Sequence, residues 1–226
     1  EEEYYLFVGI DLLIADGGSV RIFIRQLLDF YYDRFDKNRQ NAFTFKDYVE
    51  ALNDFSESST YKEDKDYWME QISLIPPAPM LPLQKDPSVI RKPQFARIEK
   101  VIPKSEWNVL QKEAKKKGIT TSTLLCTAYA LVLGYWSNQP ELTINVTVFT
   151  RYPFNEGVTD IVGDFTSVIL LRVNLLGRSD FWKLASEIQN QLMDALEHRH
   201  YDGMNVIRKI AEQAEMKEQA VMPVVF

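Results

Sequence analysis

The chain has 226 residues, of which 46% are hydrophobic, so it can bury the core of one large domain or two modest ones. Its formal charge of −6 and pI near 5.1 argue against nucleic-acid binding, which needs a clustered basic surface. No apolar run approaches the ~20 residues of a membrane span. The single Cys126 can build neither a disulfide framework nor a structural zinc site. We therefore expect a protein of the reducing cytoplasm with no membrane or metal partner.

The first half of the chain predicts one strand and three helices. Residues 4–10 are aromatic and β-branched, as strand residues are, and helix-start residues follow at 16–19. Apolar residues at helical spacing then predict a helix to about residue 33. The stretch NRQNAFTF (38–45) predicts a loop, in which Thr44 is a suitable N-cap for a helix to Phe55, and another helix is expected over 59–72.

Six prolines lie in the stretch LIPPAPMLPLQKDPSVIRKP, residues 74–93. Proline lacks an N–H and biases the preceding residue toward extended geometry. The stretch therefore predicts a rigid connector, and we place a boundary here between residues 1–85 and residues 86–226.

The second half is expected to contain both strands and helices. Residues 95–102 predict a strand, and Ser105 predicts the cap of a helix that ends at Gly118. The helix TTSTLLCTAYALVLGYWS is apolar all round, which is typical of a buried helix. The stretch LTINVTVF (142–149) alternates like a half-buried strand. The remaining predicted elements are the apolar strand FTSVILLRVNL, a helix from Ser179 to about His198, a helix from Asp202 to about Glu215, and a final strand MPVVF.

Reactive residue types are few. Cys126 lies inside the apolar helix, where burial raises the pKa of a thiol and makes it inert. His198 and His200 are two residues apart, so they face different sides of a helix and make a poor metal pair. With Arg199 they suit the negative end of a helix dipole, which favours a structural role. No cluster of histidines and cysteines exists to hold a metal.

Asp11 and Asp16 lie where the first strand is expected to end and the first helix to begin. One interpretation is an exposed acid followed by an N-cap, and the other is a functional pair of carboxylates. A buried aspartate needs a cation or several donors. Arg151, which follows the strand over 142–149, is a candidate partner.

The stretch Gly163-Asp164-Phe165-Thr166 opens the third predicted strand of the second half, FTSVILLRVNL. A glycine and an aspartate in sequence are ordinary turn residues. An apolar side chain on a loop and a threonine at the start of a strand also suit a functional site, and both interpretations stay open.

Taken together, these stretches resemble the heterocyclization subtype of the condensation domains of nonribosomal peptide synthetases. Ordinary condensation domains carry His-His-x-x-x-Asp-Gly, whereas here Asp11 and Leu12 occupy the histidine positions and Asp16-Gly17 close the motif. The Asp-x4-Asp pattern followed by Ser19 resembles the heterocyclization signature. Further stretches similar to family motifs, in the family's order, are LIPPAPMLPL, TTSTLLCTAYALVLGYWS, VTVFTRYP, VGDFTSVILLRV, LEHRHYDGMNVIRKIA and MPVVF.

The resemblance implies an α/β (α+β, two-layer) fold of two chloramphenicol-acetyltransferase-like lobes around a tunnel, here incomplete at both ends. Residues 1–85 would be the C-terminal part of the N-lobe, and residues 86–226 the N-terminal part of the C-lobe. The implied reaction joins a donor thioester to a cysteinyl, seryl or threonyl thioester and cyclodehydrates the product to a thiazoline or oxazoline, in antibiotic or siderophore biosynthesis. Family residues implicated in cyclodehydration would lie beyond Phe226. An ordinary amide-forming condensation domain and a non-catalytic carrier-docking domain stay as alternatives.

The resemblance also implies site residues and partners. It places Asp11, Asp16 and Thr166 at the catalytic centre. Residues expected to line the tunnel or support it are Ser19, Arg151, Asp164 and Phe165. Asp16 is expected to pair with Arg151 and fix the geometry between the lobes, so proton transfer by the two aspartates is not assumed. No directly bound cofactor is expected, because carrier proteins supply the phosphopantetheine arm. The implied partners are upstream and downstream peptidyl carrier proteins, an adjacent adenylation domain and the remainder of the same domain.

Overall fold

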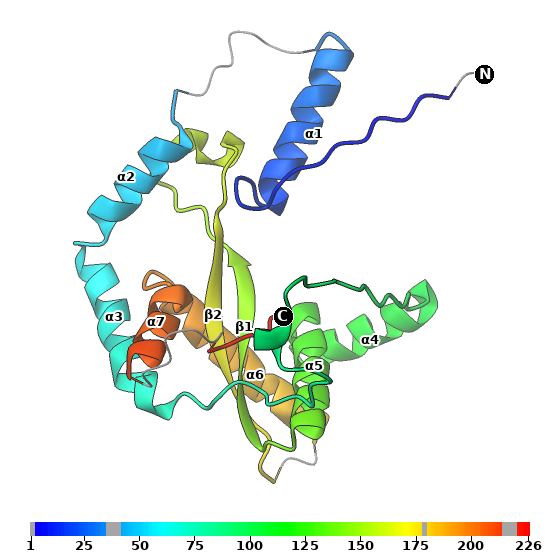
Figure 1. Ribbon diagram of the computed structural model, residues 1–226, viewed down its shortest axis with the longest axis vertical. Coiled ribbons are helices and arrows are strands. Elements are labelled where there is room, and N and C mark those ends of the chain that lie inside the picture. The colour runs from blue at the N-terminus through cyan, green and yellow to red at the C-terminus, as the bar shows by residue number, and fades with distance from the viewer. Residues whose placement is uncertain (1–2, 35–41, 178–179, 214–220) are drawn as a thin grey trace. The chain divides into compact units, whose positions relative to one another are not determined.

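The computed structural model describes residues 3–34, 42–177, 180–213 and 221–226. Its helices and strands follow one another along the chain as Figure 1 shows. They are α1 (Gly17–Tyr31), α2 (Phe45–Phe55), α3 (Ser59–Gln71), α4 (Lys104–Lys116), α5 (Thr121–Ser137), β1 (Glu141–Phe149), β2 (Thr166–Asn174), α6 (Phe181–Glu197) and α7 (Gly203–Gln213). Three short 3-10 helices cover Ile72–Leu74, Pro87–Val89 and Glu156–Asp160. In these parts of the chain no single helix is long and apolar enough to cross a membrane, although α4 and α5, which meet at a bend of 101°, pass that test when joined.

The chain forms two compact units. The first consists of Glu1–Asp66 and Thr147–Val168, and the second of Tyr67–Val146 and Ile169–Phe226. Residues 147–168, which include the Gly-Asp-Phe-Thr stretch, therefore belong with the first helices of the chain. The lobe boundary between residues 85 and 86, which the proline content and the family resemblance predict, stays a prediction.

The predicted helices form close to their expected ends because their caps are in the sequence. The Asp16 carboxylate accepts from the Ser19 amide at the start of α1, and Thr44 and Asp47 form a reciprocal capping box at α2. Asp180 caps α6, whereas the predicted cap Ser179 lies outside the described residues, as does the predicted end of α7 near Glu215. The prediction for Ser105 is wrong, because α4 begins at Lys104, directly after Pro103.

Two predicted strands do not form. Residues 3–10 and 93–103 have no regular structure, and side chains such as Phe7 and Ile98 are more than nine-tenths exposed. A strand is stabilised by hydrogen bonds to a neighbouring strand. In the described parts of the chain neither segment pairs with one, so residues of strand-forming type stay irregular.

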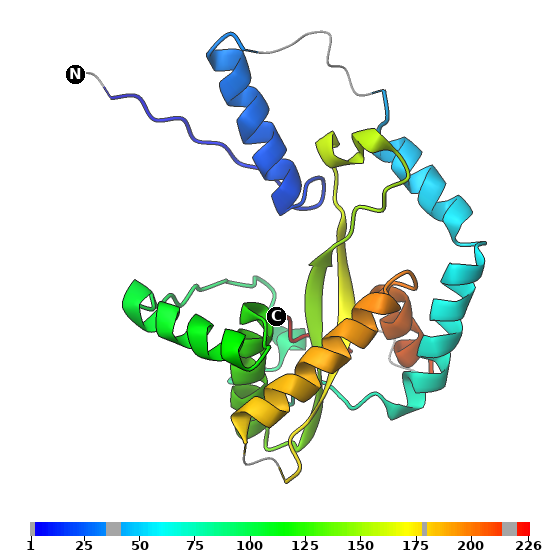
Figure 2. The same cartoon turned by 180° about the vertical axis from the view of Figure 1, so that it is seen from behind.

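Strands β1 and β2 lie side by side in both views of the molecule (Figures 1 and 2). Thr150 N donates to Phe165 O at one end, and Leu175 N donates to Pro140 O at the other, so the strands run antiparallel. The predicted strand MPVVF forms one parallel bridge to β1, between Asn145 and Val225.

The expectation that β1 is half-buried is wrong, since Leu142 to Val146 are buried on both faces. Two polar side chains among them donate to the segments beside β1, while the buried Asn145 Oδ1 has no hydrogen-bond partner among the described residues. The Thr143 hydroxyl donates to Pro76 O at 2.6 Å, and the Asn145 amide donates to Met222 O at 2.6 Å. The proline-rich stretch is thus anchored to β1, because prolines that cannot donate still offer carbonyl oxygens as acceptors.

Helix α5 packs against α6 and α4 in the second unit. Its residues Cys126, Ala130 and Leu133 are buried, but Val132 and Tyr135 are 54% and 81% exposed. The prediction that α5 is buried all round is therefore wrong. Both faces of α5 are apolar, so the composition of the helix does not show which face is packed and which face no described segment covers.

Candidate functional site

The second aspartate of the Asp-x4-Asp pattern, Asp16, is 2% exposed. Its carboxylate accepts from the Ser19 amide at 2.6 Å and from Arg151 Nη2 at 3.2 Å. Its own backbone N–H donates to Gly163 O at 3.1 Å. The predicted pair of Asp16 and Arg151 is confirmed, and it joins two segments of the first unit that are 135 positions apart in the sequence.

The guanidinium group of Arg151 contacts several groups around Asp16 at once. Nη1 donates to Val158 O and Ile161 O, while Nη2 is shared between Asp16 and the Ser19 hydroxyl. The central carbon of the guanidinium lies 3.8 Å from the centre of the Phe165 ring. The planar guanidinium thus donates to a carboxylate, a hydroxyl and two carbonyls and stacks on an aromatic ring. A lysine, with one ammonium group, could not make all these contacts.

Ser19 links the start of α1 to the Gly-Asp-Phe-Thr stretch. It is fully buried, and its hydroxyl donates to Gly163 O at 2.7 Å and accepts from Gly163 N at 3.0 Å. We call the contacts among Asp16, Ser19, Arg151 and Gly163 the Asp16 network. It holds two sequence motifs together without any residue that must titrate near neutral pH.

The environment of Asp16 favours its ionised form. Burial, the largest single effect, raises its pKa, but the hydrogen bonds from Ser19 and the positive charge of Arg151 together leave the pKa below its ordinary value of 3.8. A carboxylate of lowered pKa is a poor proton donor at neutral pH. Its geometry therefore suits a supporting role.

Phe165 is a core residue of the first unit. Tyr48, Val158, Ile161 and Phe165 form its buried cluster, and the hydrophobic residues packed against this cluster are Phe43, Phe45, Leu52, Tyr152 and Phe154. The Tyr48 hydroxyl donates to Thr150 O at 3.1 Å and accepts from Tyr152 N at 3.2 Å. The sequence carries no signal that Tyr48 belongs to this site, because only tertiary contacts bring α2 against the segment after β1.

The other predicted site residues are exposed. Asp11 lies in a turn and accepts from Leu13 N at 2.9 Å, while Asp164 accepts from Thr166 N at 2.9 Å. Thr166 is the first residue of β2, and its hydroxyl has no hydrogen-bond partner within the described parts of the chain. Asp11, Asp164 and Thr166 are thus available for contact with other molecules, whereas Asp16, Ser19, Arg151 and Phe165 hold the structure behind them.

Cys126 and His198 take the structural roles expected from the sequence, while the same expectation for His200 stays a prediction. Cys126 is fully buried, and burial raises the pKa of its thiol to about 12. The His198 ring stacks on Tyr67 at 3.6 Å, and the Trp68 indole N–H donates to the His198 carbonyl at 2.8 Å. No group of three or more histidines, cysteines or acids is placed to hold a metal ion in the residues that the structure covers.

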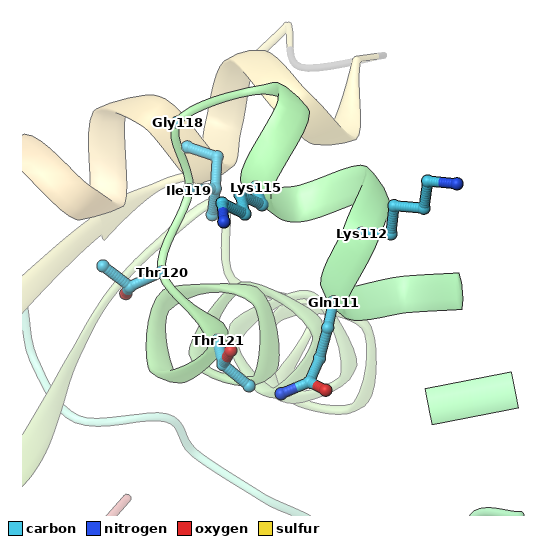
Figure 3. Close-up of a pocket in the computed structure, with 7 residues that line it drawn as sticks. All are labelled: Gln111, Lys112, Lys115, Gly118, Ile119, Thr120 and Thr121. Carbon is cyan, nitrogen blue, oxygen red and sulfur yellow. The ribbon is translucent and has the colours of Figure 1, made fainter. Parts of the chain in front are cut away.

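An open hollow of about 640 Å³ lies where α4 turns into α5 (Figure 3). Gln111, Lys112, Lys115 and residues 118–121 line it, and the Lys112 side chain extends away from Thr120 and Thr121. None of the predicted site residues contributes to it. The candidate site therefore consists of the Asp16 network and the exposed residues Asp11, Asp164 and Thr166.

Comparison with known proteins assigns the chain to a family. Residues 1–226 match the family described as Condensation domain. Bacitracin synthase 1 of Bacillus licheniformis is 41% identical over 226 residues, which are 100% of this chain and 4% of that protein. Phenyloxazoline synthase MbtB of Mycobacterium tuberculosis is 30% identical over 227 residues, covering 100% of this chain and 16% of that protein.

A solved structure is also similar. The EpoB NRPS cyclization-docking bidomain from Sorangium cellulosum matches with a TM-score of 0.84 and 34% identity, over 96% of this chain and 44% of that one. The chain thus spans less than half of the relatives it matches. It belongs to the condensation-domain family of nonribosomal peptide synthetases and shares that family's chloramphenicol-acetyltransferase-like fold.

Proposed function

We propose that the protein containing this chain joins two carrier-bound thioesters and then cyclodehydrates the amide to a thiazoline or oxazoline. The amine of a cysteinyl, seryl or threonyl acceptor attacks the donor thioester, and the carrier thiol leaves as the amide forms. The side-chain thiol or hydroxyl then attacks the amide carbonyl, and the carbonyl oxygen leaves as water. Condensation domains have no cofactor of their own, and the phosphopantetheine arms belong to the carrier partners.

The observation that carries this proposal is the acidic motif at the start of α1. Asp11 and Leu12 stand where ordinary condensation domains have histidines, and the first compact unit contains neither of the chain's two histidines. A base of imidazole type is therefore not at hand in this unit. The names of two relatives, phenyloxazoline synthase and a cyclization bidomain, support a ring-forming reaction.

In this proposal some candidate residues position the motifs and others contact the substrates. Asp16, Ser19, Arg151 and Phe165 position α1 against the Gly-Asp-Phe-Thr stretch and transfer no proton. The exposed Asp11 and Thr166 contact the substrates. Amide formation then depends mainly on proximity, because a thioester is already activated. Cyclodehydration needs an acid and a base within reach of the carbonyl and the attacking group.

One assay tests the proposal. The intact protein is given a loaded donor carrier and a loaded acceptor carrier, and the product is released and weighed. An amide lacking one water is expected. A plain amide would instead assign ordinary condensation, which the name bacitracin synthase 1 leaves open, and no product would assign a carrier-docking role.

A further inference from the structure

Tyr48, a residue of α2, holds the backbone on both sides of Arg151. It is 4% exposed, and its hydroxyl donates to Thr150 O at 3.1 Å and accepts from Tyr152 N at 3.2 Å. These two residues come directly before and directly after Arg151. One buried hydroxyl group thus fixes the short stretch of backbone from which the Arg151 side chain departs.

The ring of Tyr48 is also linked to the guanidinium of Arg151, through Phe165. The rings of Tyr48 and Phe165 meet edge to face with 4.8 Å between their centres, and the guanidinium carbon of Arg151 lies 3.8 Å from the centre of the Phe165 ring. Thr150 N donates to Phe165 O at 3.0 Å, which ties the two backbone stretches together. Tyr48 therefore constrains both the backbone of Arg151 and the aromatic ring that its guanidinium contacts.

Packing alone does not explain the hydroxyl group of Tyr48. Phe45 and Phe154 pack against the same buried cluster with plain rings, whose centres lie 6.3 and 5.5 Å from that of Tyr48. A phenylalanine at position 48 would avoid the cost of removing a hydroxyl from water, which hydrogen bonds must offset. Burial raises the pKa of Tyr48, so the hydroxyl keeps its proton and its bond to Thr150 across the neutral range.

We infer that Tyr48 is a positioning residue of the candidate site, which holds the Arg151 guanidinium against Asp16 and Ser19 and thereby fixes the start of α1. The inference rests on the proposed function only for the reaction whose rate reports it. Tyr48 itself transfers no proton and contacts no substrate, because it is buried and its hydroxyl is bonded to backbone on both sides of Arg151.

A shift of Arg151 would move the residues that are proposed to contact the substrates. Thr166 directly follows Phe165 in the sequence, and Asp11 lies five positions before Asp16. A misplacement of about 1 Å can cost about a hundredfold in rate. Loss of the Tyr48 hydroxyl should therefore lower the rate of the reaction without weakening the binding of the carriers.

Tyr48→Phe keeps the ring and removes both hydrogen bonds. The intact protein is given loaded donor and acceptor carriers, and the maximal rate of product formation and the KM for each carrier are measured. We expect the maximal rate to fall about tenfold with KM unchanged. Tyr129→Phe is the matched control, because the Tyr129 hydroxyl also donates to a backbone carbonyl, that of Val225, and its loss should leave the rate unchanged.

A double variant tests whether Tyr48 acts through Arg151. Tyr48→Phe added to Arg151→Lys should lower the maximal rate by less than about twofold, because the guanidinium that Tyr48 positions is already absent. A further loss of about tenfold would make the two effects independent and overturn the inference. An unchanged maximal rate in Tyr48→Phe alone would overturn it as well.

A stability measurement needs no product and so stands apart from the proposed function. Asp16→Asn should lower the free energy of unfolding less in Tyr48→Phe than in the wild type, because the ion pair that it removes is already weaker. An equal loss in both backgrounds would overturn the inference. A wild type that releases only plain amide would refute cyclization, and the rates of amide formation would then be compared. A wild type that forms no product would refute the proposed function and leave the stability comparison to decide.

Discussion

The hydroxyl of Ser19 and the backbone of Gly163 exchange two hydrogen bonds, at 2.7 and 3.0 Å, across 144 positions of sequence. Ser19 donates to the carbonyl and accepts from the N–H, so a single buried side chain bonds both backbone groups of Gly163, whose carbonyl also accepts from the Asp16 N–H. Arg151 Nη2 donates a third hydrogen bond, which goes to the hydroxyl oxygen of Ser19. The start of α1 and the Gly-Asp-Phe-Thr stretch are thereby held together.

Ser19→Ala should destabilise the protein by about 1–3 kcal/mol, because it leaves the buried N–H of Gly163 without a partner and removes one of the two hydrogen bonds to its carbonyl. The free energy of unfolding from urea titration measures the loss. Ser122→Ala, at an exposed position of α5, is the control and should have little effect. Equal stability of the two variants would show that the Ser19 bonds contribute nothing net.

Asp16→Ala should cost about 3–5 kcal/mol of folding free energy, because it removes one partner of a buried ion pair whose side chains are 1% and 17% exposed. Activity should fall together with stability. A variant of unchanged stability that no longer cyclizes would contradict the supporting role and make Asp16 a catalytic residue.

The contribution of Asp16 should depend on pH in the acid range. Its pKa in the folded protein lies below the ordinary 3.8, so the ionised carboxylate stabilises the fold above that value, and this stabilisation is lost as the pH falls through the folded pKa. The difference in unfolding free energy between wild type and Asp16→Asn should thus be constant near neutrality and shrink below about pH 4. A difference that grows on acidification would reverse the assignment.

Gly163→Ala should be destabilising by about 1–3 kcal/mol, as overpacked core positions are. The added Cβ would lie 2.2 Å from a ring atom of Phe45, which is too close for two carbons. Gly9→Ala is the control, because nothing lies within 4 Å of its Cβ position. Phe45→Leu combined with Gly163→Ala should recover part of the loss, and no recovery would mean that the strain is elsewhere.

The Cys126 thiol should resist alkylation in the folded protein. Its pKa of about 12 leaves almost no thiolate at pH 8, and the residue is fully buried. Mass spectrometry of the peptide containing Cys126 should show modification by iodoacetamide only after denaturation. Rapid labelling of the native protein would show that α5 opens locally.

Local rules predicted the helices and the burial of Cys126. Caps such as Asp16 and Thr44 act within one helical turn, and apolar spacing identifies a helix face, so neither needs distant contacts. The candidate pair of Asp16 and Arg151 was also predicted from the sequence, because a buried carboxylate requires a cation and Arg151 follows the predicted strand over 142–149.

The sequence by itself determined the family motifs, the helices and the acidic replacement of the histidine motif. Only the tertiary structure decided that residues 4–10 and 95–102 are not strands, that both faces of β1 are buried, and that Gly163 and Tyr48 join the site. The physical reason is that strand pairing and burial depend on partners far away in sequence. A residue's own chemistry predicts what it needs, but packing alone determines which neighbour supplies it.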